Sequence, residues 1–303
     1  MESANNMKLR IKVPATSANL GPGFDCIGIA LDWWNTIQVE TLARGLEIEC
    51  PDNLPHDKSN AVIQGMIEAF KLAGHKLPPV RVKMNAEVPI ASGLGSSSAA
   101  LVSGILAANA LMGDCFSRAQ VLSLATHIEG HPDNVTPALL GGLVVAVQEG
   151  KLVHAVRIQV PNDLRTVIFI PEYQVLTKRA RGILPHDIPR ADSIYNSGRT
   201  ALWIAALYER RYDWLDLATR DRLHQPYRAK LVRGMNELCD AARKAGARGV
   251  ALSGAGPSII AFTDHADDDI ARAMERAARK AGVEGKTHLV RVSAHGARVT
   301  RLK

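Results

Sequence analysis

The sequence reads Pro89-Ile90-Ala91-Ser92-Gly93-Leu94-Gly95-Ser96-Ser97-Ser98-Ala99-Ala100 at the point that decides the fold. Before this stretch, apolar and basic residues alternate from Val80 to Met84, which predicts a half-buried strand. After it, apolar residues recur at helical spacing from Leu101 to Met112, which predicts a helix. Strand, glycine-rich loop and helix in this order can form an anion site. The first amides of such a helix have no internal partner and lie at the positive end of its dipole.

Three other glycine-rich motifs do not match this loop. A Walker A loop ends in Gly-Lys-Ser/Thr, and this loop contains no lysine. A dinucleotide fingerprint needs a third glycine where Ser98 stands and an acid at the end of a second strand, whereas Asp114 follows a helix. The Gly-x-Ser-x-Gly motif of serine hydrolases is absent. Gly93 and Gly95 would let the backbone approach a phosphate closely. The structural alternative is a serine-capped helix behind a flexible loop.

The loop resembles the phosphate loop of the GHMP kinases, which include galactokinase, homoserine kinase, mevalonate kinase and phosphomevalonate kinase. Two further segments agree with this family, in the right order along the chain. They are Val13-Pro14-Ala15-Thr16-Ser17-Ala18-Asn19-Leu20-Gly21-Pro22-Gly23-Phe24-Asp25 and Leu252-Ser253-Gly254-Ala255-Gly256-Pro257-Ser258. The first of them resembles the homoserine kinase group of the family in particular. Together the three segments span most of the chain.

The resemblance implies an α+β fold of two domains. An ATP-binding domain like domain 2 of ribosomal protein S5 is expected at residues 1–160, and a ferredoxin-like domain at residues 161–303. The residues themselves agree, because a hairpin is predicted around Glu149-Gly150 and a new pattern begins at Thr166. From there the predicted elements follow the order β, α, β, β, α, β, which is typical of a split βαβ fold.

Local signals predict where several helices begin and end. Ser59 is expected to cap the first helix. Ser117 and Gln120 have the spacing of a capping box, for a helix that ends near Glu129. A single long helical stretch is expected from Ser193 to Ala245.

Composition indicates a soluble globular protein, which we expect in the cytoplasm. Hydrophobic residues make up 47% of the 303 residues and charged residues 22%. The net charge of +7 is dispersed and only 5% of residues are aromatic, so a nucleic-acid partner is not expected. No apolar run approaches the roughly 18 residues that span a bilayer, so a membrane partner is not expected.

Cys26, Cys50, Cys115 and Cys239 form no paired motif and are expected to be reduced thiols. The start lacks a secretory signal, and Met7 is an alternative start.

The resemblance also implies ATP and Mg²⁺ as cofactors, with the ATP phosphates on the quoted loop. It assigns the metal to Ser97 and Glu129, although Ser96 or Ser98 could take the place of Ser97. A glutamate that ends a helix is electrostatically unfavourable there, which mildly favours a functional role over an exposed one. Apolar contacts to the adenine are expected near Asn60–Ile63 and on the strand before the loop.

The substrate implied by the resemblance is L-homoserine, phosphorylated on its side-chain hydroxyl. The residues assigned to this substrate are Asn19, Asp25, His131, Asn134, Thr177, Arg181 and Arg228. Three of them, Asn19, Asp25 and Asn134, are also assigned to catalysis. Guanidinium groups suit a carboxylate because they form two parallel hydrogen bonds to it. Thr177 and Arg181 share a face if their segment is helical. Whether Asp133 acts as a base is left open, and a homodimer is compatible with the pattern.

Two other functional classes remain in view. His127 and His131 have the spacing of a zinc pair, but their order with Glu129 fits neither known zinc motif. Gly130 and Pro132 also interrupt the helix between them. The remaining alternatives are a GHMP kinase with a mevalonate- or sugar-type substrate, or a ligand-binding protein without turnover on the same fold.

Overall fold

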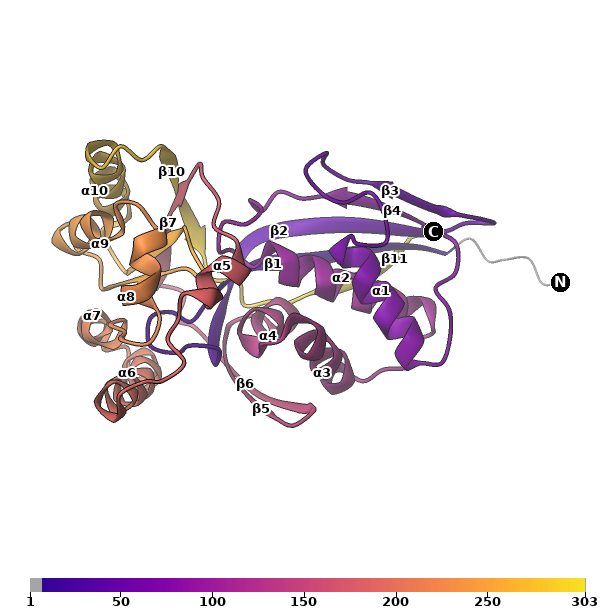
Figure 1. The fold of residues 1–303 in the computed structure, drawn as a ribbon, viewed down its shortest axis with the longest axis horizontal. Coiled ribbons are helices and arrows are strands. Elements are labelled where there is room, and N and C mark those ends of the chain that lie inside the picture. Colours follow the sequence, from indigo (N-terminus) through magenta and orange to yellow (C-terminus); the bar gives the residue numbers. More distant parts are fainter. Residues whose placement is uncertain (1–6, 303) are drawn as a thin grey trace.

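A seven-stranded sheet forms one half of the protein (Figure 1), in a computed structural model that describes residues 7–302. Its strand order is β11-β1-β2-β4-β3, and the β5–β6 hairpin joins it by pairing β5 with β2. The strands are β1 (Lys8–Ala18), β2 (Ile27–Thr41), β3 (Leu46–Glu49), β4 (Val80–Asn85), β5 (Leu143–Glu149), β6 (Leu152–Ile158) and β11 (Arg298–Leu302). Residues 1–6, where the absence of a secretory signal was expected, lie outside the described part of the chain.

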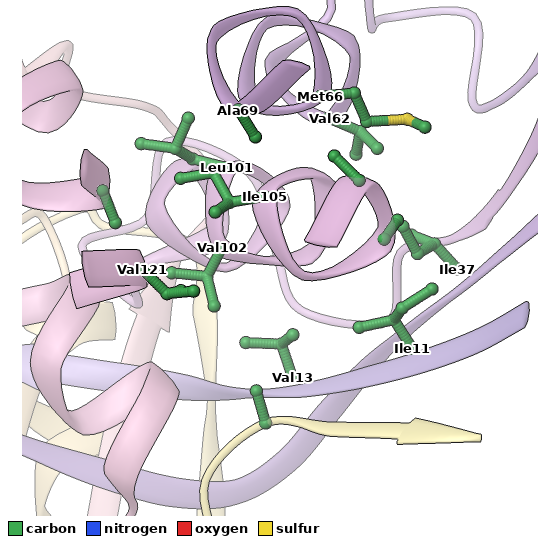
Figure 2. Packing of buried hydrophobic residues seen from close by; sticks show 14 of the residues in the cluster. Ile11, Val13, Ile37, Val62, Met66, Ala69, Leu101, Val102, Ile105 and Val121 are labelled. Atoms are coloured by element: carbon green, nitrogen blue, oxygen red, sulfur yellow. The ribbon is translucent and has the colours of Figure 1, made fainter. Parts of the chain in front are cut away.

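Four helices cover one face of this sheet in two layers and enclose its core. They are α1 (Ala61–Leu72), α2 (Ser96–Leu111), α3 (Arg118–Glu129) and α4 (Pro132–Leu140). Strand β1 buries every second residue from Leu9 to Val13 and exposes the cations between them, as its alternating sequence predicts. Helix α2 lies between α1 and the sheet, as Figure 2 shows, so it buries apolar residues around most of its circumference.

Two glycines permit the close crossing of α1 and α2. A Cβ at Gly104 would lie 1.9 Å from the carbonyl oxygen of Val62. A Cβ at Gly65 would lie 2.5 Å from the carbonyl oxygen of Leu101. The crossing anchors the helix whose first turn forms the glycine-rich loop site.

The predicted capping box is confirmed, whereas the first predicted cap is wrong by one residue. Ser117 accepts from the backbone N–H of Gln120, and the Gln120 side chain accepts from the Ser117 N–H. At α1 the N-cap is Asn60, whose side chain accepts from the N–H of Val62. Ser59 instead bonds to Asp57. Both residues favour a helix N-terminus, so composition alone does not separate them.

The second sheet has the strand order β10-β7-β9-β8, which is the ferredoxin-like arrangement that the β, α, β, β, α, β pattern predicts. Its strands are β7 (Arg165–Pro171), β8 (Gly249–Leu252), β9 (Ile259–Thr263) and β10 (Gly285–Arg291). The expected single helical stretch from Ser193 to Ala245 is wrong, because the long helix α6 (Arg190–Tyr208) ends at Tyr208 and the chain then turns several times between shorter helices. The elements of this half are α5 (Thr177–Gly182), α6 (Arg190–Tyr208), η1 (Tyr212–Trp214), α7 (Leu215–Ala218), α8 (Gln225–Arg228), η2 (Ala229–Leu231), α9 (Met235–Lys244) and α10 (Asp267–Lys280).

The C-terminal end of the chain returns to the first sheet. Strand β11 pairs antiparallel with β1, with Val299 opposite Ile11. Strand β11, which lies within the expected second domain of residues 161–303, therefore belongs to the first sheet. The expected boundary near Pro161 lies between β6 and β7. No helix in residues 7–302 is long and apolar enough to cross a membrane.

The core of the first half yields a stability prediction. Ile105 is fully buried between α2 and its neighbours, as Figure 2 shows. We expect Ile105→Ala to lower the free energy of unfolding by about 2–5 kcal/mol, because it removes buried methyl groups and leaves a cavity. The measurement is urea unfolding followed by circular dichroism. Leu72→Ala, on a side chain that is 57% exposed, is the control. A loss no larger than that of the control would contradict the packing described here.

Candidate active site

A pocket lies where the first turn of α2 faces α5 and the loop between β8 and β9, and Figure 1 shows α5 at the junction of the two halves. Its lining residues are Asn19, Ala91, Ser92, Gly93, Gly95, Ser96, Ser97, Ser98, Glu129, His131, Asp133, Asn134, Thr177, Arg181, Arg228, Gly254 and Ala255. Every predicted substrate residue except Asp25 is among them. Within the predicted phosphate loop, Leu94 and Ala99 turn into the core instead, and Pro89 and Ile90 line neighbouring hollows.

The glycine-rich loop presents the open end of α2 to this pocket. Gly95 is the N-cap, with φ +67°, and no side chain caps the first turn. The helix also has no acidic residue in that turn. Its first amides and the positive end of its dipole are thus available to an anion.

Strained backbone gathers around the same pocket. Four of the six non-glycine residues with positive φ in the described chain are Asn19, Leu20, Asp25 and Ala91. Left-handed backbone is costly for such residues and is retained where the surroundings impose it, often at functional sites. The glycine-rich loop and the Val13–Asp25 segment therefore carry their strained residues around one pocket.

The Leu252–Ser258 segment packs against the glycine-rich loop and supports it. Ser253 Oγ donates to the carbonyl of Gly93 at 2.7 Å, and the Ser258 N–H donates to the carbonyl of Ser92 at 3.2 Å. A Cβ at Gly93 would lie 2.3 Å from the Ser253 carbonyl oxygen. The absence of a side chain at this position therefore serves the packing of two loops as well as access for a ligand.

Oxygen donors suited to Mg²⁺ lie beside the first turn of α2. Glu129 ends α3 and accepts a 2.5 Å hydrogen bond from Ser98 Oγ. Ser96, Ser97 and Ser98 all line the pocket. The serine that contacts Glu129 is Ser98, whereas Ser97 was the one first assigned to the metal. A carboxylate and hydroxyls next to a phosphate site are the hard ligands that Mg²⁺ prefers. The donor set therefore fits this metal.

His131 and Asp133 form a buried pair at the start of α4. The Nδ1 of His131 lies 2.5 Å from Asp133 Oδ1. Burial opposes protonation of the ring, but the hydrogen bond and the charge of Asp133 outweigh it and raise the pKa of His131. Asn134, the next residue, accepts from Thr16 Oγ1 at 2.8 Å.

The zinc interpretation finds no support in this arrangement. His127 is exposed on α3, whereas His131 caps α4 and points into the pocket. Gly130, with φ +89°, turns the chain between the two helices. Within residues 7–302, the one cluster with metal-ligand spacing comprises Asp25, His131 and Asp133. Its members already neutralise one another or pair with Arg181.

Asn19 and Asp25 are engaged with protein partners. The Asn19 side chain accepts from the Asp25 N–H at 3.0 Å and donates to the carbonyl of Gly254 at 3.2 Å. The Asp25 carboxylate accepts two hydrogen bonds from the Arg181 guanidinium, at 2.6 and 3.0 Å. Asn19 thus ties two motif loops together, and Asp25 orients an arginine of the pocket. Thr177 and Arg181 both lie in the short helix α5, which is the condition under which their spacing places them on one face.

Arg228 is a buried cation without a carboxylate partner among the described residues. It is 1% exposed, and its hydrogen bonds to main-chain oxygens reach Ala180 at 3.2 Å and Gly254 at 3.0 Å. Burial and the neighbouring charge of Arg181 lower its pKa to about 10, so it stays charged at neutral pH. A buried charge is costly unless it is paired. The pocket is therefore prepared for an anionic ligand at this point.

A second cavity, of about 330 Å³, opens beside the phosphate loop. It shares Ala91, Ser96, Ser97 and Thr177 with the pocket and is otherwise mainly apolar. Asn60 and Ala61 line it, as expected for the adenine region, whereas Ile63 belongs to the core. Sequence reasoning missed the contributions of Leu54 and Pro55, which precede α1 and carry no motif.

Comparison with known proteins agrees with this geometry. Residues 60–142 match the family model for the GHMP kinases N terminal domain, and residues 203–282 match the model for GHMP kinases C terminal. A protein of Caldicellulosiruptor saccharolyticus named homoserine kinase is 42% identical over 295 residues, which cover 96% of each chain. The chain belongs to the GHMP kinase family. Its two-sheet fold and the order of its three motifs are those of that family.

Two further relatives of this GHMP kinase match over nearly the full length. One is the protein of Desulfitobacterium hafniense named homoserine kinase, 40% identical, with 96% of this chain and 99% of that protein covered. The other is the crystal structure of homoserine kinase from Cytophaga hutchinsonii. It is 28% identical, has a TM-score of 0.88 and covers 99% of both chains.

Proposed function

We propose that this GHMP kinase transfers the γ-phosphate of ATP to the side-chain hydroxyl of L-homoserine. The observation that carries the proposal is the buried, unpaired guanidinium of Arg228 in a pocket that also contains the open end of α2. That combination fits a substrate with a carboxylate beside the phosphates of a nucleotide. The full-length relatives named homoserine kinase support the same substrate.

ATP would lie across the two hollows. Its phosphates would meet the first amides of α2, and its adenine would enter the neighbouring apolar cavity. Glu129, with Ser97 or Ser98, would hold Mg²⁺. When bound, the metal supplies positive charge that neutralises the phosphates.

The substrate residues fall into two groups. Arg228 and Arg181 would contact the carboxylate, with Thr177 near it, while His131 and Asn134 would face the reacting hydroxyl. Asn19 would act by holding two loops of the pocket together, since its side chain already bonds to both. Asp25 would act by orienting Arg181, with which it already pairs.

In the reaction, the homoserine oxygen forms a bond to the γ-phosphorus and the bond to the β–γ bridging oxygen breaks. ADP leaves with the bond electrons. Asp133 already shares its carboxylate with His131. We therefore assign the hydroxyl proton to an oxygen of the transferred phosphate, which a loose transition state tolerates.

The product, O-phospho-L-homoserine, would serve threonine biosynthesis in the cytoplasm. All four cysteines are free, which is typical of a reducing compartment. The homodimer stays a prediction.

The decisive experiment is an ADP-release assay with four alcohols: L-homoserine, mevalonate, galactose and L-threonine. We expect L-homoserine to give the highest kcat/KM, because galactose has no carboxylate for Arg228 and L-threonine has a shorter, branched arm. Faster turnover of mevalonate or galactose would favour the other kinase alternative. ATP binding without ADP release for any of the four would favour a protein without turnover.

A further inference from the structure

A fully buried histidine stands directly behind Arg228. The Nε2 of His224 lies 2.7 Å from the carbonyl oxygen of Gly21, and its Nδ1 lies 3.2 Å from Nη1 of Arg228. The ring thus connects the glycine-rich turn of the Val13–Asp25 segment with the Arg228 guanidinium of the pocket. His224 itself does not line the pocket.

These two neighbours determine the protonation of the ring. The carbonyl of Gly21 can only accept, so Nε2 carries the hydrogen, and the Arg228 guanidinium can only donate, so Nδ1 is the acceptor. Burial lowers the pKa of His224, against the influence of Asp221, whose nearer carboxylate oxygen lies 3.6 Å from Nε2. Arg228 and Asp25 are the other charged groups that act on it. A neutral ring in a single tautomer satisfies both contacts.

The surroundings hold this ring in place. Asp221, whose side chain is fully buried, accepts hydrogen bonds from the backbone N–H groups of Leu223, His224 and Gln225. The ring of Phe24 lies 5.3 Å from the His224 ring and 5.3 Å from the Arg228 Cζ, so it packs against both. The imidazole is therefore a rigid acceptor rather than a mobile one.

We infer that His224 is a positioning residue, which aims the Arg228 guanidinium at the substrate carboxylate by accepting one of its hydrogen bonds. The inference rests on the proposed function and deepens it. The main-chain oxygens of Ala180 and Gly254 hold Nε and Nη1 of the guanidinium. The Nδ1 of His224 is the one side-chain acceptor bonded to it within residues 7–302. Without that acceptor, the guanidinium is held by main-chain carbonyls alone.

Two substitutions separate the two contacts of the ring. In His224→Asn the amide oxygen can take the place of Nδ1 and still accept from Arg228, but the contact to Gly21 is lost. In His224→Gln the amide nitrogen can take the place of Nε2 and still donate to Gly21, but the acceptor for Arg228 is lost. Both replace an aromatic ring by a smaller amide, so a general effect on stability should be similar in the two variants.

We expect His224→Gln to raise the KM for L-homoserine roughly tenfold and His224→Asn to raise it much less, since one hydrogen bond to a charged group is lost in only the first. The KM for ATP should stay near that of the wild type in both. 3-Aminopropan-1-ol, which is homoserine without its carboxylate, should show little difference between the variants. In an Arg228→Ala background, His224→Gln should raise the homoserine KM no further.

Equal effects of the two substitutions on homoserine, or an equal loss with 3-aminopropan-1-ol, would overturn the inference and leave His224 a packing residue. Both variants are first checked by circular dichroism and by ATP binding. If either fails to fold, homoserine binding to the folded variant is measured by calorimetry and compared with the wild type. If the wild type itself does not phosphorylate L-homoserine, the proposed function fails instead, so the two failures are distinct.

Discussion

Glu129→Gln is expected to lower kcat by roughly 10²–10³, because the loss of one charge-stabilising contact made mainly in the transition state costs about 3–4 kcal/mol. The substitution keeps the shape of the side chain and its hydrogen bond with Ser98 while it removes the negative charge. ATP binding should remain measurable, since the first amides of α2 are unchanged. The measurement is kcat at saturating ATP, homoserine and Mg²⁺.

The control for this variant is Glu149→Gln, on a side chain that is 86% exposed in the β5–β6 hairpin. It removes the same charge from the protein without touching the pocket, and its kcat should match that of the wild type. A near-normal kcat for Glu129→Gln at saturating Mg²⁺ would remove Glu129 from the metal site.

Arg228→Ala is expected to raise the KM for L-homoserine ten- to a hundredfold, since each hydrogen bond to a charged group contributes about 1.5–3 kcal/mol. The KM for ATP should change far less, because Arg228 does not line the apolar cavity assigned to the adenine. Arg181→Lys should act in the same direction with a smaller effect. Lysine retains the charge but cannot reproduce the paired hydrogen bonds that the guanidinium makes to Asp25.

Two comparisons separate a carboxylate contact from a structural defect. Arg222→Ala removes an arginine that is 50% exposed and pairs with Asp192, and it should leave both KM values unchanged. 3-Aminopropan-1-ol should be a poor substrate of the wild type, and Arg228→Ala should scarcely worsen it. If Arg228→Ala penalises both substrates equally, the arginine is structural or directed at phosphate, and the assignment of homoserine loses its main physical support.

Much of the architecture could be predicted because its signals are local. The capping box at Ser117 involves residues three apart, and the glycine-rich loop is contiguous. The ferredoxin-like order needed only the succession of strands and helices after Thr166. Where two neighbouring residues are equally suited to one role, the prediction was less precise. Asn60 caps α1 instead of Ser59. Ser98, one of the two serines left as alternatives to Ser97, is the one that contacts Glu129.

Contacts between distant segments could not be read in this way. The pairing of β11 with β1 joins the two ends of the chain, and no local pattern records it. The bidentate contact between Asp25 and Arg181 crosses 156 positions of sequence. His224 precedes Arg228 by only four residues, yet its contact with Gly21 spans 203 positions. The role proposed for Asp25 or His224 therefore depends on partners that only the folded chain brings next to it.

The sequence by itself determined the family, the glycine-rich loop before α2 and most of the polar residues that the pocket gathers, because each depends on short motifs whose backbone requirements are local. Only the tertiary structure decided which of those residues are left to meet a ligand. Asn19 and Asp25 are satisfied by protein groups, whereas Arg228 is buried without a carboxylate partner within residues 7–302. The physical reason is that the cost of a buried charge depends on what surrounds it in space. Those surroundings come from segments that the sequence keeps far apart.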